Sequence, residues 1–368
     1  MTAVSPAVSS ALDHVPVESE CASPDRPQRG SDFASLCRTI RAAGLLDRRP
    51  VSYAARIMLT LGAYAGAWAL FVWLGHSWWQ LLVAVALGVL FTQVAFLGHD
   101  GAHQQIVRGR LGNDLLSVFA GNLLVGLSFG WWVDKHNRHH AHPNHEGRDP
   151  DIGDGVLAFT TDQVAAKHDG LGRFIARRQA VLFFPLLTLE GLNLHVASGR
   201  FLFGGGAVAR AGRYRRLELV LFTVHVLAYL GALLVVLGPL QAAAFFAVHQ
   251  AVFGLYMGCS FAPNHKGMPT FPAEARVDHL RRQVLTSRNV RGGWLVDQLL
   301  GGLNYQIEHH LFPSLPRANL RKAQRLVRAH CAERAIDYVE TSLVGSYAIV
   351  LRHLHGLGAP LRTAPVAA

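Results

Sequence analysis

The sequence predicts an all-α membrane protein, in which four transmembrane helices form two hairpins beneath a cytosolic helical cap with a histidine-rich metal site. Two observations predict this fold class. The chain of 368 residues is 51% hydrophobic and only 16% charged, which is more apolar than a soluble domain of this size requires. Its 20 histidines also include short clusters that follow long apolar segments.

The N-terminal segment, residues 1–50, is polar, rich in Ser, Pro and Arg, and too poor in apolar runs for a signal peptide. We expect it to be cytosolic and largely disordered. The main domain is expected in residues 51–345, followed by a C-terminal tail in residues 346–368. The 4 cysteines form no CxxC pair, so neither a disulfide framework nor a thiolate metal site is indicated.

Two uncharged stretches supply the spans, since a transmembrane helix needs about 20 apolar residues. Residues 57–97 contain no Asp, Glu, Lys or Arg and break at Gly75, beside three tryptophans typical of a membrane interface. Residues 219–264 are equally free of charge and break at Gly238. The predicted spans are about 57–74, 78–97, 218–237 and 240–260.

The positive charges indicate the orientation of these spans. The formal net charge is +11, and 31 of the 35 basic residues are Arg. All of them lie in residues 1–56, 98–216 and 265–368, which two hairpins would place on one side. The positive-inside rule makes that side cytosolic, together with both termini. Because the basic residues are excluded from the apolar tracts, we expect them to face a lipid surface and expect no nucleic-acid partner.

Three further segments combine apolar and polar residues. We interpret the apolar stretches Leu115–Val133 and Ala180–Ala197 as re-entrant or interfacial helices, because a single crossing at the first would separate histidines that we expect to share one site. The basic segment Arg317–Arg334 mixes apolar residues with Arg and Lys at helical spacing. This pattern predicts an amphipathic helix lying on the lipid head groups.

Three clusters contain seven histidines at helical spacing, and an eighth, His265, ends the fourth apolar stretch. Residues three and four apart share one face of a helix, and imidazole binds iron, zinc, copper and nickel. Eight ligands are too many for one tetrahedral zinc, so we predict a site for two metal ions. The clusters are His99-Asp100-Gly101-Ala102-His103, His136-Asn137-Arg138-His139-His140 and Gln306-Ile307-Glu308-His309-His310.

Other polar residues receive a structural interpretation. His225 and His249 lie inside predicted spans, where we expect hydrogen bonds rather than metal binding. We also favour a structural role for three further histidines: His142, His145 and His195. Four carboxylates near the clusters are expected to be solvated or to cap helices, with orientation of the metal ligands as the alternative. They are Asp100, Asp149, Asp151 and Glu308.

The motifs HDGAH, HNRHH and QIEHH resemble the three histidine boxes of the membrane fatty acid desaturase family. The segments HHAHPNHEGRDPDI, FAPNHKGMP and NYQIEHHLFPSLPR resemble its acyl-CoA and acyl-lipid branch, including linoleoyl-CoA and front-end desaturases, over about Val51 to Tyr338. The resemblance implies a desaturase domain in residues 51–345, with a diiron site in the cap above an acyl tunnel. It implies as iron ligands His99, His103, His136, His139, His140, His265, His309 and His310.

The resemblance also concerns residues beside the ligands. Gln306 stands where many relatives have a histidine, and Asn264 resembles an asparagine that the family has near the metals. Of the four carboxylates named above, Asp100 is the candidate for a place beside a metal ligand. Trp131 and Trp132 end an apolar stretch just before the second box, so they are predicted to line the acyl tunnel, although a membrane anchor explains the stretch nearly as well. No HPGG haem motif occurs, so we expect no fused cytochrome b5 and a separate electron donor, of the ferredoxin type or cytochrome b5 with its reductase.

The expected function is O2-dependent insertion of a C=C bond into an acyl chain, carried by coenzyme A or a lipid. No side-chain acid or base can attack an unactivated methylene, so two iron ions (Fe2+/Fe3+) and O2 would supply the chemistry, and no separate acid or base is assigned. A fatty acyl hydroxylase on the same scaffold is the alternative, and a histidine-rich metal transporter a more distant one. We expect a multi-pass protein of a bacterial cell membrane with a cytosolic active site.

Overall fold

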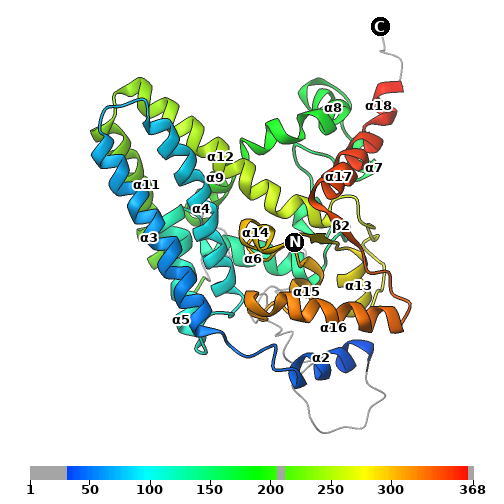
Figure 1. Cartoon of the computed structure of the whole chain (residues 1–368). Helices are drawn as coiled ribbons and strands as arrows, with labels where there is room; N and C mark the ends of the chain where they lie inside the picture. The colour runs from blue at the N-terminus through cyan, green and yellow to red at the C-terminus, as the bar shows by residue number, and fades with distance from the viewer. Residues whose placement is uncertain (1–30, 205–211, 364–368) are drawn as a thin grey trace, which may run out of the picture.

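The computed structural model describes residues 31–204 and 212–363, and the chain is mostly helical throughout (Figure 1). The first thirty residues, expected to be disordered, lie outside the described part. The rest of the N-terminal segment contains helix α2 (Asp32–Ala42), which Ser31 caps by accepting a hydrogen bond from the backbone N–H of Ala34. Most of the expected C-terminal tail is also helical, in α17 (Leu343–Leu357) and α18 (Ala359–Thr363).

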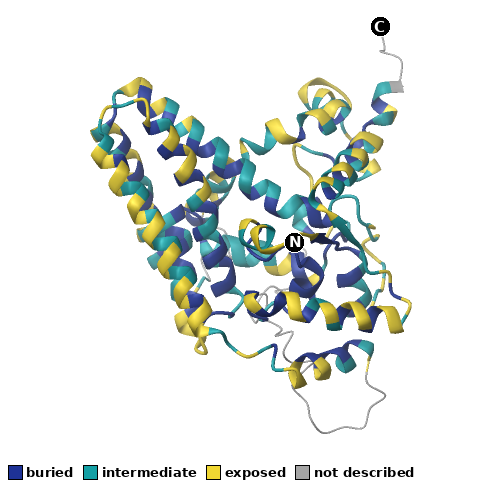
Figure 2. Cartoon of the chain, viewed as in Figure 1, coloured by how far each residue is buried: buried dark blue, intermediate teal, exposed yellow. Residues whose placement is uncertain are grey.

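Within the described residues, four helices are long and apolar enough to cross a membrane, at the positions that the charge-free stretches predict. They are α3 (Pro50–Leu74), α4 (Gln80–Ala102), α11 (Arg215–Val236) and α12 (Pro239–His265). The inner helices α4 and α12 pack tightly, since a Cβ atom on Gly88 would lie 2.9 Å from the Val252 side chain. The outer helices α3 and α11 bury only 17% and 22% of the residues in their most apolar windows, and Figure 2 shows yellow on their outer faces. Such surfaces suit lipid contact.

Two bent helix pairs occupy the stretches interpreted as re-entrant or interfacial. In the first pair, α5 (Arg110–Val118) continues as the π-helix η1 (Phe119–Val125), and α6 (Phe129–Ala141) follows at an angle of 114°. In the second pair, α8 (Gly170–Leu187) and α9 (Glu190–Phe203) meet at 79°. By length and composition each pair fits either a re-entrant loop or a broken span, which would raise the number of spans to six.

The first bend leaves carbonyl groups that need partners, because a helix end has unsatisfied backbone groups and a membrane interior offers no water. Residues 123–125 accept hydrogen bonds from three other helices: His225 Nδ1 in α11 (2.9 Å), Tyr64 OH in α3 (2.8 Å) and His195 Nε2 in α9 (2.8 Å). His225 and His195 therefore have the structural role expected of them. His249, the other histidine within a span, bonds the hydroxyl of Tyr229 at 2.9 Å.

The same bend also presents hydrogen-bond donors on residues 122–130, and Glu218 of α11 accepts from them. One oxygen of its buried carboxylate accepts from Ser128 Oγ (2.8 Å), the backbone N–H of Gly130 (2.9 Å) and Asn122 Nδ2 (3.3 Å). Ser128 is also the N-cap of α6 and accepts from the backbone N–H of Trp131. The start of α6, which carries the second histidine cluster, is thus tied to α11.

A core of buried side chains lies where α2, α13 (His279–Leu285), α15 (Gln306–Leu311) and α16 (Leu320–Glu333) pack together. The prediction that residues 317–334 lie on lipid head groups is wrong for the apolar face of α16. Its residues Leu320, Ala323, Val327 and Cys331 are buried in this protein core, while Arg321 and Arg328 remain exposed. An amphipathic pattern does not distinguish a protein core from a membrane surface.

The remaining strands and helices are short. Strands β1 (Asn289–Arg291) and β2 (Glu340–Ser342) form a parallel pair with Asn289 opposite Glu340. Helix α17 packs against α8, where Phe183 contacts Val350 and Leu354. The other short helices are η2 (Pro150–Ile152), α7 (Thr161–Ala165), α14 (Trp294–Leu299) and η3 (Arg317–Asn319).

Candidate metal centre

The eight histidines singled out from the sequence come together between the ends of four helices. They lie on α4 and its C-cap, on α6, at the last position of α12, and on α15. Seven of them form two groups with ligand nitrogens close enough to hold a metal ion. The first group is His99, His103, His136 and His309, and the second is His139, His265 and His310.

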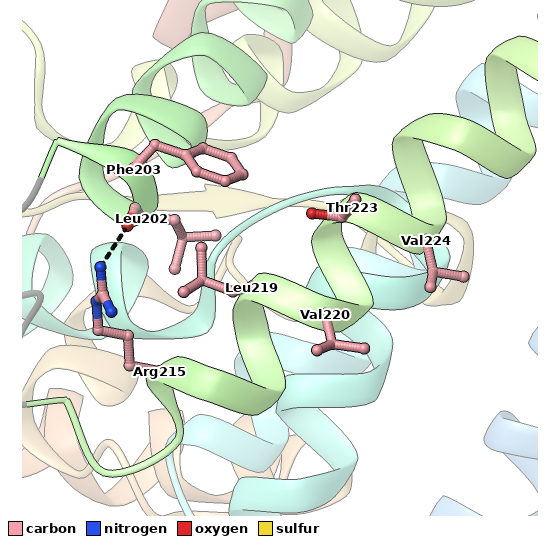
Figure 3. Close-up of a pocket in the computed structure, with 7 residues that line it drawn as sticks. All are labelled: Leu202, Phe203, Arg215, Leu219, Val220, Thr223 and Val224. Carbon is pink, nitrogen blue, oxygen red and sulfur yellow. Dashed lines mark hydrogen bonds between the residues drawn. The ribbon is translucent and has the colours of Figure 1, made fainter.

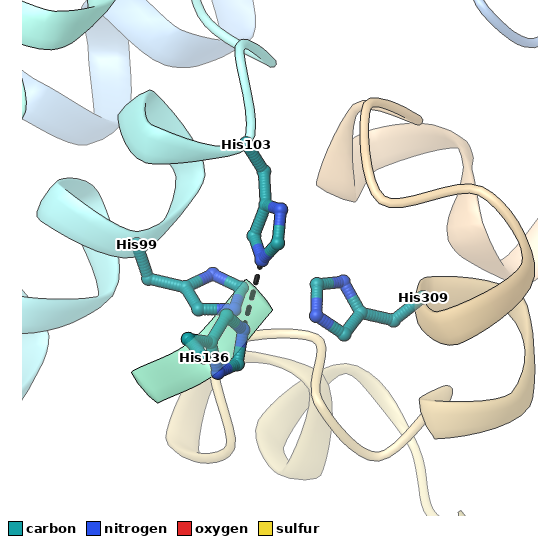
Figure 4. A group of neighbouring side chains, drawn as sticks. All are labelled: His99, His103, His136 and His309. Carbon is teal, nitrogen blue, oxygen red and sulfur yellow. Dashed lines mark hydrogen bonds between the residues drawn. The ribbon is translucent and has the colours of Figure 1, made fainter. Parts of the chain in front are cut away.

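The first group has the spacing of ligands around one ion. Its four ligand nitrogens lie within 4.8 Å of one another, and the rings point toward a common centre (Figure 4). His103 Nε2 and His136 Nε2 are 2.9 Å apart. Two nitrogens that each lie about 2.1 Å from one ion, at roughly 90°, would be about 3.0 Å from each other. The observed spacing therefore suits neighbouring ligands of a single metal.

The second group is similarly compact, with ring centroids 4.7 Å apart for His139 and His265 and 4.6 Å apart for His265 and His310. His140 lies between the groups. Its Nε2 is 3.0 Å from His136 Nε2 in the first group, and its ring stacks on His310 in the second with centroids 4.2 Å apart. The eight rings thus form one continuous cluster with two centres.

Hydrogen bonds at Nδ1 orient four of the rings. Nδ1 faces an acceptor in four rings: His99 with Asp100 (3.2 Å), His139 with Asp149 (3.0 Å), His265 with the Thr286 carbonyl (3.0 Å) and His310 with Gln283 (2.9 Å). A proton on Nδ1 leaves the lone pair on Nε2. Among the described residues, the buried Nε2 atoms of His99, His309 and His310 find no hydrogen-bond partner. Buried nitrogens without partners are costly, so these residues fit a bound metal.

The pKa shifts of the histidines in α15 also fit a bound metal. Burial, followed by the neighbouring imidazoles, lowers the pKa of His309 and His310 well below the ordinary value. Both rings are therefore neutral, as metal ligands must be. Burial also raises the pKa of Glu308, the residue directly before His309, to about 7. Glu308 accepts from Asn289 Nδ2 and Tyr338 OH, both at 2.7 Å, so it faces the strand rather than a ligand ring.

Asp100 and Asp149 are both buried beside ligand rings, so neither carboxylate is solvated. Asp149 accepts from His139 Nδ1 and from the backbone N–H of Asn144 (2.7 Å). Burial raises the pKa of Asp149, but His139 and Lys266 together bring it below its ordinary value. Asp149 also caps η2, through the N–H of Asp151.

His139, Asp149 and Asp151 form a further group with metal-ligand spacing. Both carboxylates face Nδ1 of His139, whose other side belongs to the second histidine group. Asp151 is moreover paired with Lys135, and its carbonyl accepts from Lys266 at 2.7 Å. We therefore interpret the two carboxylates as groups that orient His139.

The amides expected next to the metals lie beside the second group. Gln306 Nε2 is 3.0 Å from His265 Nε2, and Gln306 Oε1 accepts from Asn264 Nδ2 at 3.2 Å. Asn264 Nδ2 also donates to the Leu303 carbonyl at 3.1 Å. Within the described part of the chain, Asn264 Oδ1 is buried without a partner. The second group thus has three histidines and an amide where the first has four histidines.

The two tryptophans predicted to line a tunnel differ in position. Trp132 stacks on His136 with centroids 4.2 Å apart and meets His99 edge-on at 5.4 Å, so it lies directly against the first group. Trp131 is held at the start of α6 by its backbone N–H, which donates to Ser128. His142 and His145 contact each other at 5.8 Å. Among the described residues, no ring contact joins these two to the eight clustered histidines.

A surface pocket of about 480 Å³ lies elsewhere, between α9 and α11. It is a groove lined mostly by apolar side chains, including Phe203 and Val224, with Arg215 at one end (Figure 3). Arg215 donates to the Leu202 carbonyl at 3.1 Å. None of the clustered histidines lines this groove, so it is not the metal centre.

Comparisons with known proteins agree with this geometry. Residues 76–342 match the family model described as fatty acid desaturase. The chain is 32% identical over 327 residues to Delta(5) fatty acid desaturase fat-4 of Caenorhabditis elegans, covering 85% of this chain and 70% of that protein. It is 29% identical over 343 residues to Delta(6)-fatty-acid desaturase fat-3 of the same organism, covering 88% and 74%. It is 30% identical over 334 residues to a Delta(8)-fatty-acid desaturase of Euglena gracilis, covering 88% and 78%.

Proposed function

Because this chain belongs to the fatty acid desaturase family and is therefore an oxidoreductase, we propose that it introduces a C=C bond into an acyl chain at a histidine-bound diiron centre. The observation that carries the proposal is the convergence of eight histidines into two adjacent groups, with buried Nε2 atoms that lack partners in the described part of the chain. Imidazole groups of this size also bind zinc, but zinc has no redox chemistry, so oxidation of an unactivated methylene favours iron.

The proposed ligands follow the two groups. His99, His103, His136 and His309 would hold one iron, and His139, His265 and His310 the other, with His140 in contact with both groups. When bound, two reduced irons would supply the activation of O2 that removal of hydrogen from an unactivated methylene requires. Gln306 and Asn264 would complete the surroundings of the second iron.

The protein itself contributes orientation and exclusion of water. Asp100, Asp149, Gln283 and the Thr286 carbonyl hold four rings with Nε2 toward the centre. Most of the clustered rings are buried, so the centre is shielded from solvent. Trp132, which covers His136 and His99, would form part of the wall against which the acyl chain lies, with Trp131 beside it at the start of α6.

We propose the membrane arrangement that the charge distribution indicates. The four long helices would span the bilayer as two hairpins, with the cap, the metal centre and both termini in the cytosol. The acyl chain would be presented on a lipid or on coenzyme A, and electrons would come from a separate donor of the ferredoxin or cytochrome b5 type. The expected bacterial cell membrane stays a prediction, since the relatives compared above are eukaryotic.

The test is expression of the full chain in a host without polyunsaturated lipids, with mass spectrometry of the lipids and iron analysis of the purified protein. New double bonds and two irons per chain would support the proposal. His139→Ala should insert in the membrane but lose iron and product together. The matched control is His355→Ala, because His355 is exposed and remote from the cluster in sequence. Hydroxylated lipids would point to the alternative oxygenase, and a protein purified without iron would refute the metal assignment.

A further inference from the structure

Each histidine group contains one ring backed by a carboxylate. In the first group Asp100 faces Nδ1 of His99 at 3.2 Å, and in the second Asp149 faces Nδ1 of His139 at 3.0 Å. The Nδ1 atoms of His265 and His310 have neutral partners instead. A carboxylate behind a metal-binding imidazole fixes the ring and strengthens its donation to the metal.

A buried cation accompanies the first of these carboxylates. Arg317 Nη2 lies 2.7 Å from Asp100 Oδ2, and the side chains are 6% and 2% exposed. Arg317 follows the third histidine cluster by a short turn, whereas Asp100 belongs to the first cluster. The contact therefore runs from the guanidinium through the carboxylate to the ring of His99 and joins two clusters that are distant in sequence.

The surroundings of Arg317 are built to hold it in this place. Its Nη2 also donates to the Phe96 carbonyl at 3.3 Å, and its backbone N–H donates to Tyr53 OH at 3.3 Å. Gly302 has a φ of +81°, and a Cβ atom there would lie 2.7 Å from Arg317 Cγ. The glycine thus leaves the space that the arginine side chain fills.

Stability alone is a poor explanation for such a pair. Removing two charges from water costs several kcal/mol per ion, and replacing a buried ion pair by apolar residues is often neutral or stabilising. The pair stands directly behind a proposed metal ligand, and the planar guanidinium can fix a carboxylate in a way that the flexible ammonium of lysine does not reproduce.

We propose that Arg317 is a positioning residue that acts through Asp100 on His99, and so governs the metal held by the first histidine group but not the metal held by the second. This inference rests on the proposed diiron function. The second group has its own counterpart, because Asp151 beside His139 is paired with Lys135. Each metal would then depend on a different cation.

The test uses the full-length protein purified from the membrane and loaded with iron enriched for Mössbauer spectroscopy. In Arg317→Met, one of the two iron environments should change or empty, with affinity at that site reduced about 10- to 100-fold. Arg317→Lys should restore the site in part. The double variant Arg317→Met with Asp100→Asn should be no worse than Asp100→Asn alone, since it strands no buried charge. Lys135→Met should affect the other iron.

The matched control is Arg321→Met, because Arg321 is 54% exposed on the same segment and its partner Asp297 contacts no clustered histidine among the described residues. It should keep both iron environments. The inference would be overturned if Arg317→Met kept both iron environments unchanged. It would also be overturned if Arg317→Met and the double variant lost both irons equally, because the ion pair would then have only a structural role. Wild-type protein without iron would instead refute the proposed function on which the inference rests.

Discussion

Replacing Glu218 by Ala should destabilise the protein and empty its metal centre, although Glu218 touches none of the clustered histidines in the described structure. Glu218 is 2% exposed, and its carboxylate accepts three hydrogen bonds at the bend between η1 and α6. Helix α6 carries His136, His139 and His140. If the carboxylate holds the start of this helix, its loss should displace three ligands at once.

The expected loss of stability can be estimated from the hydrogen-bond donors that lose their acceptor. Truncation leaves the hydroxyl of Ser128 and the backbone N–H of Gly130 without their short bonds, and an unpaired buried donor costs about 1–3 kcal/mol. Part of the loss is offset because a buried charge disappears. We expect about 2–4 kcal/mol of destabilisation, which corresponds to about 4–8 °C if 1 kcal/mol shifts Tm by about 2 °C in a protein of this size. Glu218→Gln keeps an acceptor and should lose about half as much.

Two measurements on protein purified in detergent check this prediction: thermal unfolding, and iron per chain after loading under identical conditions. The matched control is Glu333→Ala, since the Glu333 side chain is 71% exposed at the end of α16. It should behave like the wild type. If Glu218→Ala unfolds at the wild-type temperature and retains its iron, the bend does not depend on this carboxylate and the reasoning fails.

Three further predictions concern the bend and the metals. Gly126→Ala should lower the free energy of unfolding by about 1–3 kcal/mol, because Gly126 has a φ of +79° and a Cβ atom would lie 2.5 Å from the ring of His225. The control Gly66→Ala, where a Cβ atom meets open space, should leave Tm unchanged, and an equally unchanged Tm in Gly126→Ala would contradict the prediction. Asp149→Asn should weaken iron binding about 10- to 100-fold by releasing His139, and full iron content after dialysis would argue against that role. Chelation of the metal should lower Tm and added Fe2+ should restore it, because a ligand that binds only the folded state stabilises it; equal Tm values with and without metal would refute a bound ion.

The spans and the histidine clusters were accessible from sequence because each depends on a local pattern. Absence of charge over about 20 residues is sufficient to locate a span, and the helices match the predicted stretches while extending beyond them, as α12 does to His265. Spacing of three and four predicts which histidines share a helix face. It does not specify which faces meet, so the division into two groups, with His140 between them, required the structure.

The partners of the ligand rings were not predictable for a different reason. Gln283 and the Thr286 carbonyl contact His310 and His265 from a helix whose sequence has no metal-binding signature. The amphipathic pattern places Arg317 in a surface helix, although its side chain is buried. Charge and amphipathic spacing are properties of a segment alone, whereas burial depends on what the rest of the chain places against it.

The bend at residues 125–130 indicates what additional signal the sequence contained. Burying a polar side chain within an apolar helix has a free-energy cost. Nevertheless, four polar side chains from α3, α9 and α11 form hydrogen bonds with backbone groups at this single break: Tyr64, His195, His225 and Glu218. None of these four residues contacts a clustered histidine among the described residues, and none belongs to a sequence motif. The only sequence signal for each is a polar side chain near or inside an apolar stretch. Because unsatisfied backbone cannot persist in lipid, several such residues on separate spans imply a helix break at their common depth, and here that break sets the direction of the helix with the second histidine cluster.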